Sequence, residues 1–344
     1  MTTTATTTSH ATLRRHGKSF HWAGFFLPRQ QLDDGARLYY VCRQVDDIAD
    51  NAVGTPERQR ARKVLCCLQS RLKAHLPDLA SQPLANAGLT NADRQLVDAL
   101  EADIVALFEQ NARCLYAMQA LVATMVMDLS PLHLPDEPAL LDYAHGAAGT
   151  VGVMMCQLMN AREPDHSLAF AIDLGIAMQM TNVARDVLED AQRGRIYLPQ
   201  TWMSDNVTAD AIVRGTPHAR DEAWQATRYL VARAEDYYAS GWQGLAYLPA
   251  RSRLAIGIAL RVYRQIGRRI VSLNAPDYWA QRVVVPTPNK VRQSILALPT
   301  LMHTTPARHD QTLHQGLEKT LAAYALTPRT LANTPQNSAG KTAP

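Results

Sequence analysis

The sequence has few cysteines, and their spacing matches no metal-binding motif. The 344 residues include only Cys42, Cys66, Cys67, Cys114 and Cys156. An odd and scattered set of this kind is typical of a reducing compartment, which argues against a disulfide framework and favours a cytoplasmic location.

Dense basic runs are also missing. The chain has 35 Lys and Arg against 31 Asp and Glu, a net charge of +4. This small and dispersed excess lacks the basic stripe of a nucleic-acid-binding protein, so we expect no nucleic-acid partner. Glycine (17) and proline (19) are too few for a fibrous or low-complexity chain.

Long apolar runs are absent too. The longest uncharged stretch is 143–161, and it contains His145, Gln157, Asn160 and three glycines. Its length would suffice for a membrane span, but this composition favours a helix buried inside the protein. We therefore expect no membrane-spanning segment.

Apolar residues recur instead at intervals of three and four, which predicts helices. The predicted helices cover 30–52, 57–76, 92–127, 137–160, 166–192, 218–244, 251–272 and 287–298. The best strand candidate is the run Val283-Val284-Val285. The Thr-rich residues 1–15 and residues 301–344 are expected to be mostly disordered tails, although the lack of acids at the N-terminus also faintly resembles a transit peptide. Residues 16–300 then form one all-α domain.

Two segments carry pairs of aspartates four residues apart, so that each pair shares one helix face. The pairs are Asp46 with Asp50, and Asp186 with Asp190, and no other acids in the chain have this spacing. About three such pairs are expected by chance among 31 acids, so the spacing alone is equally typical of a solvated helix face.

The surroundings of both pairs favour a site. Leu38-Tyr39-Tyr40-Val41 precedes the first pair, and Ile176-Ala177-Met178 precedes the second. Burying unpartnered like charges costs several kcal/mol per ion, and a divalent cation removes that cost. Carboxylates with phosphate oxygens and water suit Mg²⁺. Two such helix faces on opposite walls of one cavity would hold metal-bridged diphosphates.

Polar neighbours occur at helical spacing around both pairs. Arg43 and Arg185 are each three or four residues before an acid, which fits either an ion pair on the same helix or a phosphate donor. Asn182 and Gln179 fit either a buried hydrogen bond or the same cavity.

At this point the sequence resembles the phytoene/squalene synthase family, over about residues 16–290. The matching motifs are Ser19-Phe20, Leu27-Pro28, Tyr39 to Asp50, Tyr143, Ala148 to Gly152, Gln179 to Asp190, Gly194 to Pro199, Val262-Tyr263-Arg264 and Arg282 to Lys290. Together these motifs are highly specific.

The resemblance implies an isoprenoid-synthase helical bundle around a central apolar cavity, with Mg²⁺ or Mn²⁺ and two prenyl diphosphates at its mouth. The implied metal ligands are Asp46, Asp50, Asn182, Asp186 and Asp190. The implied catalytic residues are the four aspartates with Arg43 and Tyr143, and the implied substrate-binding residues are His16, Ser19, Arg43, Gln179, Asn182, Arg185, Tyr263, Arg282 and Lys290.

Several positions depart from the family pattern or admit two interpretations. In the helix before Asp128 the family usually has a Gly-Met, and this chain has Ala123-Thr124-Met125-Val126-Met127. His145 with Gly146 stands where a Tyr and a larger or basic residue are frequent. The glycines between 146 and 152 lack the spacing of a dinucleotide motif. They indicate either close helix packing or a bent helix that exposes carbonyls to a carbocation.

The implied reaction is head-to-head condensation of two prenyl diphosphates. Small residues at Ala23, Gly24 and Ala36 would leave room for twenty-carbon chains, which favours phytoene synthase, with no NADPH required. The alternatives are a squalene or dehydrosqualene synthase that uses farnesyl diphosphate, and a non-catalytic helical assembly factor. A hydrocarbon product implies peripheral membrane contact, with a downstream desaturase as a partner.

Overall fold

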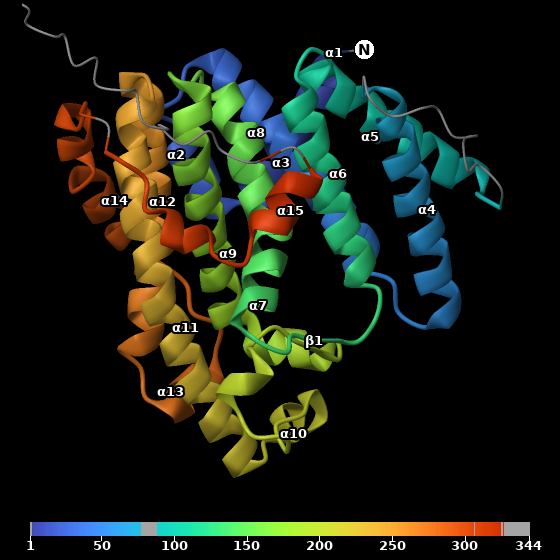
Figure 1. Ribbon diagram of the computed structural model, residues 1–344, viewed down its shortest axis with the longest axis vertical. Helices are drawn as coiled ribbons and strands as arrows, with labels where there is room; N and C mark the ends of the chain where they lie inside the picture. The colour runs from blue at the N-terminus through green and yellow to red at the C-terminus, as the bar shows by residue number, and fades with distance from the viewer. Residues whose placement is uncertain (1, 77–87, 306, 325, 327–344) are drawn as a thin grey trace, which may run out of the picture.

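The computed structural model is a bundle of helices whose axes run roughly along the long direction of the molecule (Figure 1). It describes residues 2–76, 88–305, 307–324 and 326, and the side chains from residue 7 onward. Within these residues the α-helices are α1 Thr2–His16, α2 Lys18–Gly24, α3 Arg29–Asp50, α4 Thr55–Ala74, α5 Asn91–Phe108, α6 Ala112–Met127, α7 Glu137–Ala144, α8 Thr150–Leu158, α9 Pro164–Gln192, α10 Ala209–Arg214, α11 Pro217–Gly244, α12 Ala250–Val271, α13 Ala275–Ala280, α14 Thr287–Ile295 and α15 Glu318–Ala323. The expected all-α, single-domain fold is confirmed.

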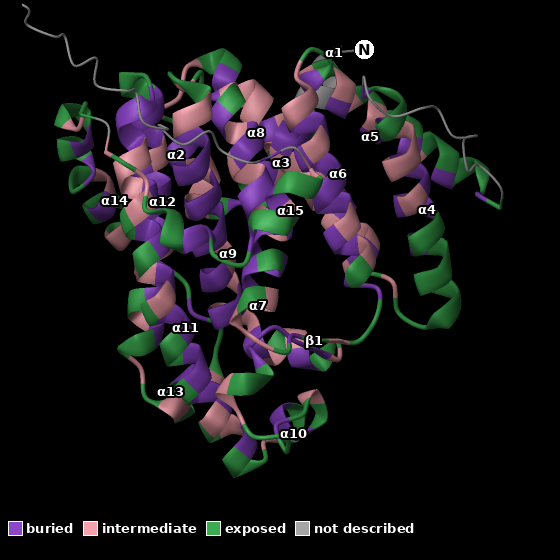
Figure 2. Cartoon of the chain, viewed as in Figure 1, coloured by how far each residue is buried: buried purple, intermediate pink, exposed green. Residues whose placement is uncertain are grey.

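Helix α9 is the centre of the bundle, and α8, α11 and α12 pack against it. Figure 2 shows most of the buried residues on these central helices and more exposed ones on the outer helices. Among the described residues, only α9 is both long and apolar enough to cross a membrane, and 78% of its most apolar window is buried inside the protein. Helix α9 is therefore a core helix of the bundle.

Close backbone contact joins α8 to α9. A β-carbon on Gly152 would lie 2.1 Å from the Ala171 carbonyl oxygen, and one on Gly175 would lie 2.2 Å from the Ala148 oxygen. The preceding turn, His145–Gly149, is a π-helix, a feature that often marks a functional site. The glycines therefore serve close packing, and the helix is also locally irregular there.

Two predicted elements, one helix and one strand, differ from the structure. The predicted helix 92–127 is two helices, because Asn111 caps the second by accepting a hydrogen bond from the Cys114 backbone N–H. The Val283–Val285 run is an irregular segment between α13 and α14. The strands in the described residues are β1 Leu132–His133 and β2 Arg195–Ile196, which pair in parallel.

The predicted tails are wrong where the structure describes them. Helix α1 packs on α3 and buries Leu13, although it is Thr-rich. At the other end, the segment 307–324 buries Leu313, Leu317 and Leu321. Their spacing of four was obscured by the polar residues around them. Residues 327–344, also predicted to be disordered, lie outside the described residues.

The α8–α9 contact gives a stability prediction. Gly175→Ala would push its methyl group into backbone that cannot move aside, so we expect a loss of about 1–3 kcal/mol in the free energy of unfolding. Gly35→Ala is the control, because a β-carbon there meets nothing within 4 Å and alanine favours the helix. Urea unfolding measures both variants. Equal stability of the two would contradict the packing assigned to Gly175.

Candidate active site

One cavity of about 1030 Å³ opens between α2, α3, α8, α9 and α12. Every residue that the sequence assigns to the site lines it: His16, Ser19, Arg43, Asp46, Asp50, Tyr143, Gln179, Asn182, Arg185, Asp186, Asp190, Tyr263, Arg282 and Lys290. The two aspartate pairs, about 140 residues apart in sequence, therefore do face one space.

The first pair lies on the last turns of α3. Arg43 donates to Asp46 at 2.9 Å and forms a further ion pair with Asp47 at 2.5 Å. Asp50 accepts from Arg195 at 2.6 Å. The ion-pair interpretation of Arg43 thus describes this structure, and Arg43 also orients a carboxylate that faces the cavity.

The second pair lies at a kink in α9. The helix continues to Gln192, but Asp186 has non-helical backbone angles (φ −109°, ψ 15°). Two residues earlier, the Ala184 carbonyl accepts a hydrogen bond from the Tyr278 hydroxyl at 2.8 Å. A side chain that enters the helical hydrogen-bond ladder in this way is a known cause of kinks. The spacing predicted that Asp186 and Asp190 share one helix face, but because of the kink they do not lie on one regular face.

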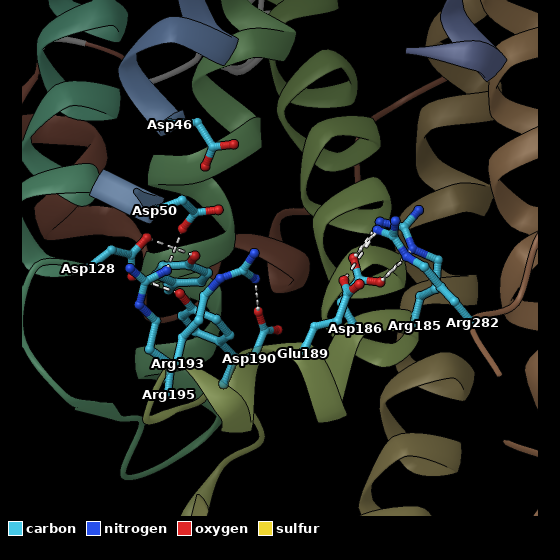
Figure 3. A network of polar contacts seen from close by, with 12 residues as sticks. Asp46, Asp50, Asp128, Arg185, Asp186, Glu189, Asp190, Arg193, Arg195 and Arg282 are labelled. Atoms are coloured by element: carbon cyan, nitrogen blue, oxygen red, sulfur yellow. Dashed lines mark hydrogen bonds and ion pairs between the residues drawn. The ribbon is translucent and has the colours of Figure 1, made fainter. Parts of the chain in front are cut away.

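Two arginines hold Asp186. Arg185 donates to it at 2.8 and 2.5 Å, and Arg282 donates at 2.8 and 3.0 Å. The sequence placed the partner of Arg185 three or four residues along the helix, whereas in the structure it is the neighbouring residue. Figure 3 shows this group on one side and Asp46, Asp50 and Asp128 on the other, with Asp190 between them.

A fifth aspartate, Asp128, was not assigned to the site from the sequence. It is 5% exposed and accepts hydrogen bonds from Tyr143 at 3.2 Å and Tyr197 at 2.9 Å, and these two rings stack with centroids 4.4 Å apart. The available signal was a lone acid at the end of the apolar helix 112–127. Arg195 and Tyr197 lie in the motif Gly194 to Pro199, for which the sequence predicted no function.

The short sheet positions these missed residues. Gly194 ends α9 with φ 77°, a left-handed conformation that favours glycine. The chain then enters β2, which pairs with β1 just after the end of α6. This turn brings Arg195 and Tyr197 from the end of α9 to Asp50 and Asp128.

The carboxylates differ in their electrostatics. Burial, with the Asp50 charge second, raises the pKa of Asp46 to about 7, although its side chain is 39% exposed, because that exposure is to the cavity. Burial raises the pKa of Asp128 to about 6 and that of Asp190 well above its usual range. Burial also acts on Asp186, but hydrogen bonds from Arg185 and Arg282 outweigh it and lower its pKa.

These residues fit a divalent metal. Asp46, Asp50 and Asp190 are crowded carboxylates whose charges repel, and a cation would relieve that repulsion. The Asn182 side-chain oxygen is buried without a hydrogen-bond partner among the described residues, while its amide donates to Gln179 at 3.2 Å. A hard oxygen donor of this kind completes an oxygen-rich ligand set.

Beyond the polar mouth the cavity is apolar. Ala23, Gly24 and Ala36 line it, as the sequence predicted. Its further lining includes Val151, Met155, Phe170, Leu174, Leu245, Ile256 and Ala259. Water is poorly accommodated by such walls, so the apolar part suits long hydrocarbon chains.

The squalene/phytoene synthase family model matches residues 13–289. The chain belongs to the squalene/phytoene synthase family. This match confirms the family and the prenyltransferase class that the sequence motifs predicted.

Named relatives support the same assignment. A 15-cis-phytoene synthase from Enterobacter agglomerans is 33% identical over 85% of this chain and 94% of its own. Another, from a Paracoccus strain, is 35% identical over 80% of this chain and 85% of its own. Among solved structures, a dehydrosqualene synthase with a bound ligand has a TM-score of 0.66 and 20% identity, and covers 87% of this chain and 97% of its own. At that identity it shows the fold alone.

The pKa of Asp46 gives a pH-dependent prediction. Its folded value of about 7 lies above the ordinary 3.8, so its stabilising effect is full below pH 3.8 and is lost as pH rises through 7. In metal-free protein, Asp46→Asn should therefore raise the unfolding temperature by about 2–4 °C at pH 8 and by less at pH 5.5. Thermal unfolding checks this, with the exposed Asp210→Asn as control. An equal gain at both pH values would be inconsistent with a raised pKa.

Proposed function

We propose that this protein is a phytoene synthase of carotenoid biosynthesis. It joins two geranylgeranyl diphosphates head to head, through prephytoene diphosphate, and releases diphosphate. The observation that carries the proposal is the placement of both aspartate pairs, with their arginines, at one end of an otherwise apolar cavity. The two relatives named 15-cis-phytoene synthase support this choice of product.

The polar mouth binds the diphosphates. Asp46 and Asp50 serve one, and Asp186 and Asp190 serve the other, with Asn182 as a further metal ligand. Mg²⁺, or Mn²⁺ in its place, would neutralise charge on the departing diphosphate. Arg43, Arg185 and Arg282, which hold carboxylates in the structure, turn to phosphate oxygens when substrate is bound. The remaining contacts come from His16, Ser19, Gln179, Tyr263 and Lys290.

The apolar walls protect the reacting centre. An allylic cation formed after diphosphate leaves would be quenched by water, so the hydrocarbon-lined space must stay dry. Holding two chains side by side supplies much of the rate, because it replaces a bimolecular encounter with a fixed geometry. Tyr143 borders this space, and its hydroxyl donates a hydrogen bond to Asp128. This bond holds the Tyr143 oxygen at the boundary between the polar and apolar parts of the cavity.

The metal-binding role gives a mutational prediction. Asp50→Ala and Asp190→Ala should each lower turnover by about 100-fold or more while the far-UV circular dichroism stays helical. Asp210→Ala, at an exposed acid on α10, should keep full activity. Near-normal activity in either site variant would count against the metal assignment.

The product identity gives the most direct test of the proposed function. The purified protein is incubated with Mg²⁺ and either geranylgeranyl or farnesyl diphosphate, with and without NADPH. We expect a forty-carbon hydrocarbon from geranylgeranyl diphosphate without NADPH. A thirty-carbon product alone would identify a squalene or dehydrosqualene synthase instead.

A lipid surface is the expected destination of this hydrocarbon, and we propose that the face around α14 contacts it. Exposed apolar side chains gather there: Phe25, Val284, Val291, Ile295, Leu298 and Met302. Val284 also lines the cavity, and a hydrogen bond from Trp22 to Ser294 joins α2 to α14. The cavity thus opens beside the apolar face, which would pass product to the bilayer and on to a desaturase.

Vesicle binding checks this face. Ile295→Glu with Met302→Glu should abolish cosedimentation with anionic phospholipid vesicles, because both charges would have to enter the lipid interface. Val213→Glu, an equally apolar exposed site on α10, should still cosediment. Unchanged binding of the double variant would exclude the α14 face as the contact.

A further inference from the structure

A second group of metal-binding residue types lies apart from the active-site carboxylates. Asp173 of α9 accepts a hydrogen bond from His309 Nε2 at 2.7 Å on one oxygen and from His314 Nε2 at 2.7 Å on the other. Ser240 of α11 also donates to the first oxygen at 2.5 Å. Three segments distant in sequence therefore converge on one carboxylate.

This carboxylate is deeply buried. The Asp173 side chain has no exposed surface, and the two histidine side chains are 11% and 10% exposed. A lone buried carboxylate costs several kcal/mol unless a positive partner compensates it. The described contacts of Asp173 include no arginine or lysine, so compensation must come from protonated histidine or from a cation.

The residue types and their spacing suit a transition metal. Two histidines separated by four residues match the H-x₃₋₅-H spacing common in zinc sites, and a carboxylate from elsewhere in the chain supplies an oxygen ligand. Two histidines and one carboxylate together favour zinc or a similar borderline ion over Mg²⁺. The serine hydroxyl or a water would take the fourth position of a tetrahedron.

The geometry is close to that of a loaded site. The three ligand atoms of Asp173, His309 and His314 all lie within 4.8 Å of one another. Ligands at the usual zinc distances of about 2.1 Å are separated by about 3.4 Å in a tetrahedron. To admit an ion, the atoms that are hydrogen-bonded at 2.7 Å would separate by about 0.7 Å, and ligand atoms as far apart as 4.8 Å would approach by about 1.4 Å.

A further histidine supports a polar ligand at this place. His145, in the π-helix that packs on α9, is fully buried, and neither ring nitrogen has a hydrogen-bond partner in the described part of the chain. Burial, with nearby His314 second, lowers its pKa to about 4, so the ring is neutral. A neutral imidazole close enough to His314 for their charges to interact would accept a hydrogen bond from a water on an ion held by the cluster.

We propose that Asp173, His309 and His314 form a binding site for one divalent transition-metal ion of the zinc class. The ion fastens the segment 307–324 to α9. The same segment is already joined to the neighbouring α11 by the Tyr237 hydroxyl, which donates to the Leu313 carbonyl at 2.8 Å.

The site lies behind the apolar wall of the active-site cavity. Phe170 and Leu174, on either side of Asp173 along α9, line the cavity, and the His309 ring meets the Phe170 ring edge-on with centroids 5.1 Å apart. Metal binding therefore stiffens the wall against which substrate chains pack. The role is structural, and it is independent of the proposed Mg²⁺ chemistry.

Zinc binding by the full-length protein tests the proposal without any substrate. Protein stripped with a chelator is titrated with Zn²⁺ against a chromophoric competitor, in excess Mg²⁺ that occupies the active-site carboxylates. We expect one tight zinc per chain and a higher unfolding temperature when it binds. His309→Gln and His314→Gln should each weaken binding by about 30-fold or more, whereas His218→Gln, at an exposed histidine, should not.

Cobalt substitution guards against a variant that fails to fold. Co²⁺ added to the wild-type protein should give the intense visible absorption of a four-coordinate site, and Zn²⁺ should bleach it. Absence of stoichiometric zinc, or zinc binding unaffected by both histidine substitutions, would overturn the proposal. The cluster would then be a purely hydrogen-bonded clasp, and the proposed phytoene synthase activity would stand untouched.

Discussion

Carboxylates that crowd into one hydrocarbon-lined cavity are the constraint on which the rest of this structure depends. Asp46, Asp50, Asp128, Asp186 and Asp190 all line it, and their mutual repulsion must be compensated. Part of the compensation is internal: arginines bind the first and second pairs, and Tyr143 and Tyr197 donate to Asp128. The negative charge that these groups leave uncompensated is seen in the raised pKa values of Asp46, Asp128 and Asp190. A cation with its diphosphate would compensate it.

Several details of the fold serve this arrangement. The kink in α9 separates Asp186 from the regular helix, the left-handed Gly194 turns the chain, and the two-residue strand β2 returns Arg195 to Asp50. Close helix contact at Gly152 and Gly175 shapes the wall next to the hydrocarbon space. The same central helices thus join the charged mouth to the apolar interior, so a diphosphate bound at one end would position its hydrocarbon chain at the other.

Much of this was predictable from the sequence, because helical periodicity and aspartate spacing are local signals. The fold class and the long helices followed from the periodicity, while the family and most residues of the cavity followed from the resemblance carried by the motifs. Asp128 did not, since a single acid after an apolar helix has no spacing to mark it. The kink at Asp186 depends on Tyr278, ninety-odd residues away, and the ordered segment around His309 and His314 depends on Asp173. These contacts exist only after folding, and residues 301–324 therefore looked like a polar tail.

The central claim is that both aspartate pairs bind metal-bridged diphosphates in one cavity. A crystal structure with Mn²⁺ and a non-cleavable prenyl thiodiphosphate, examined for anomalous scattering, tests it most directly. The account predicts manganese peaks against Asp46 and Asp50 on one wall and against Asp186 and Asp190 on the other, with the prenyl chains in the apolar interior. Manganese absent from these carboxylates while the thiodiphosphate binds elsewhere would contradict it.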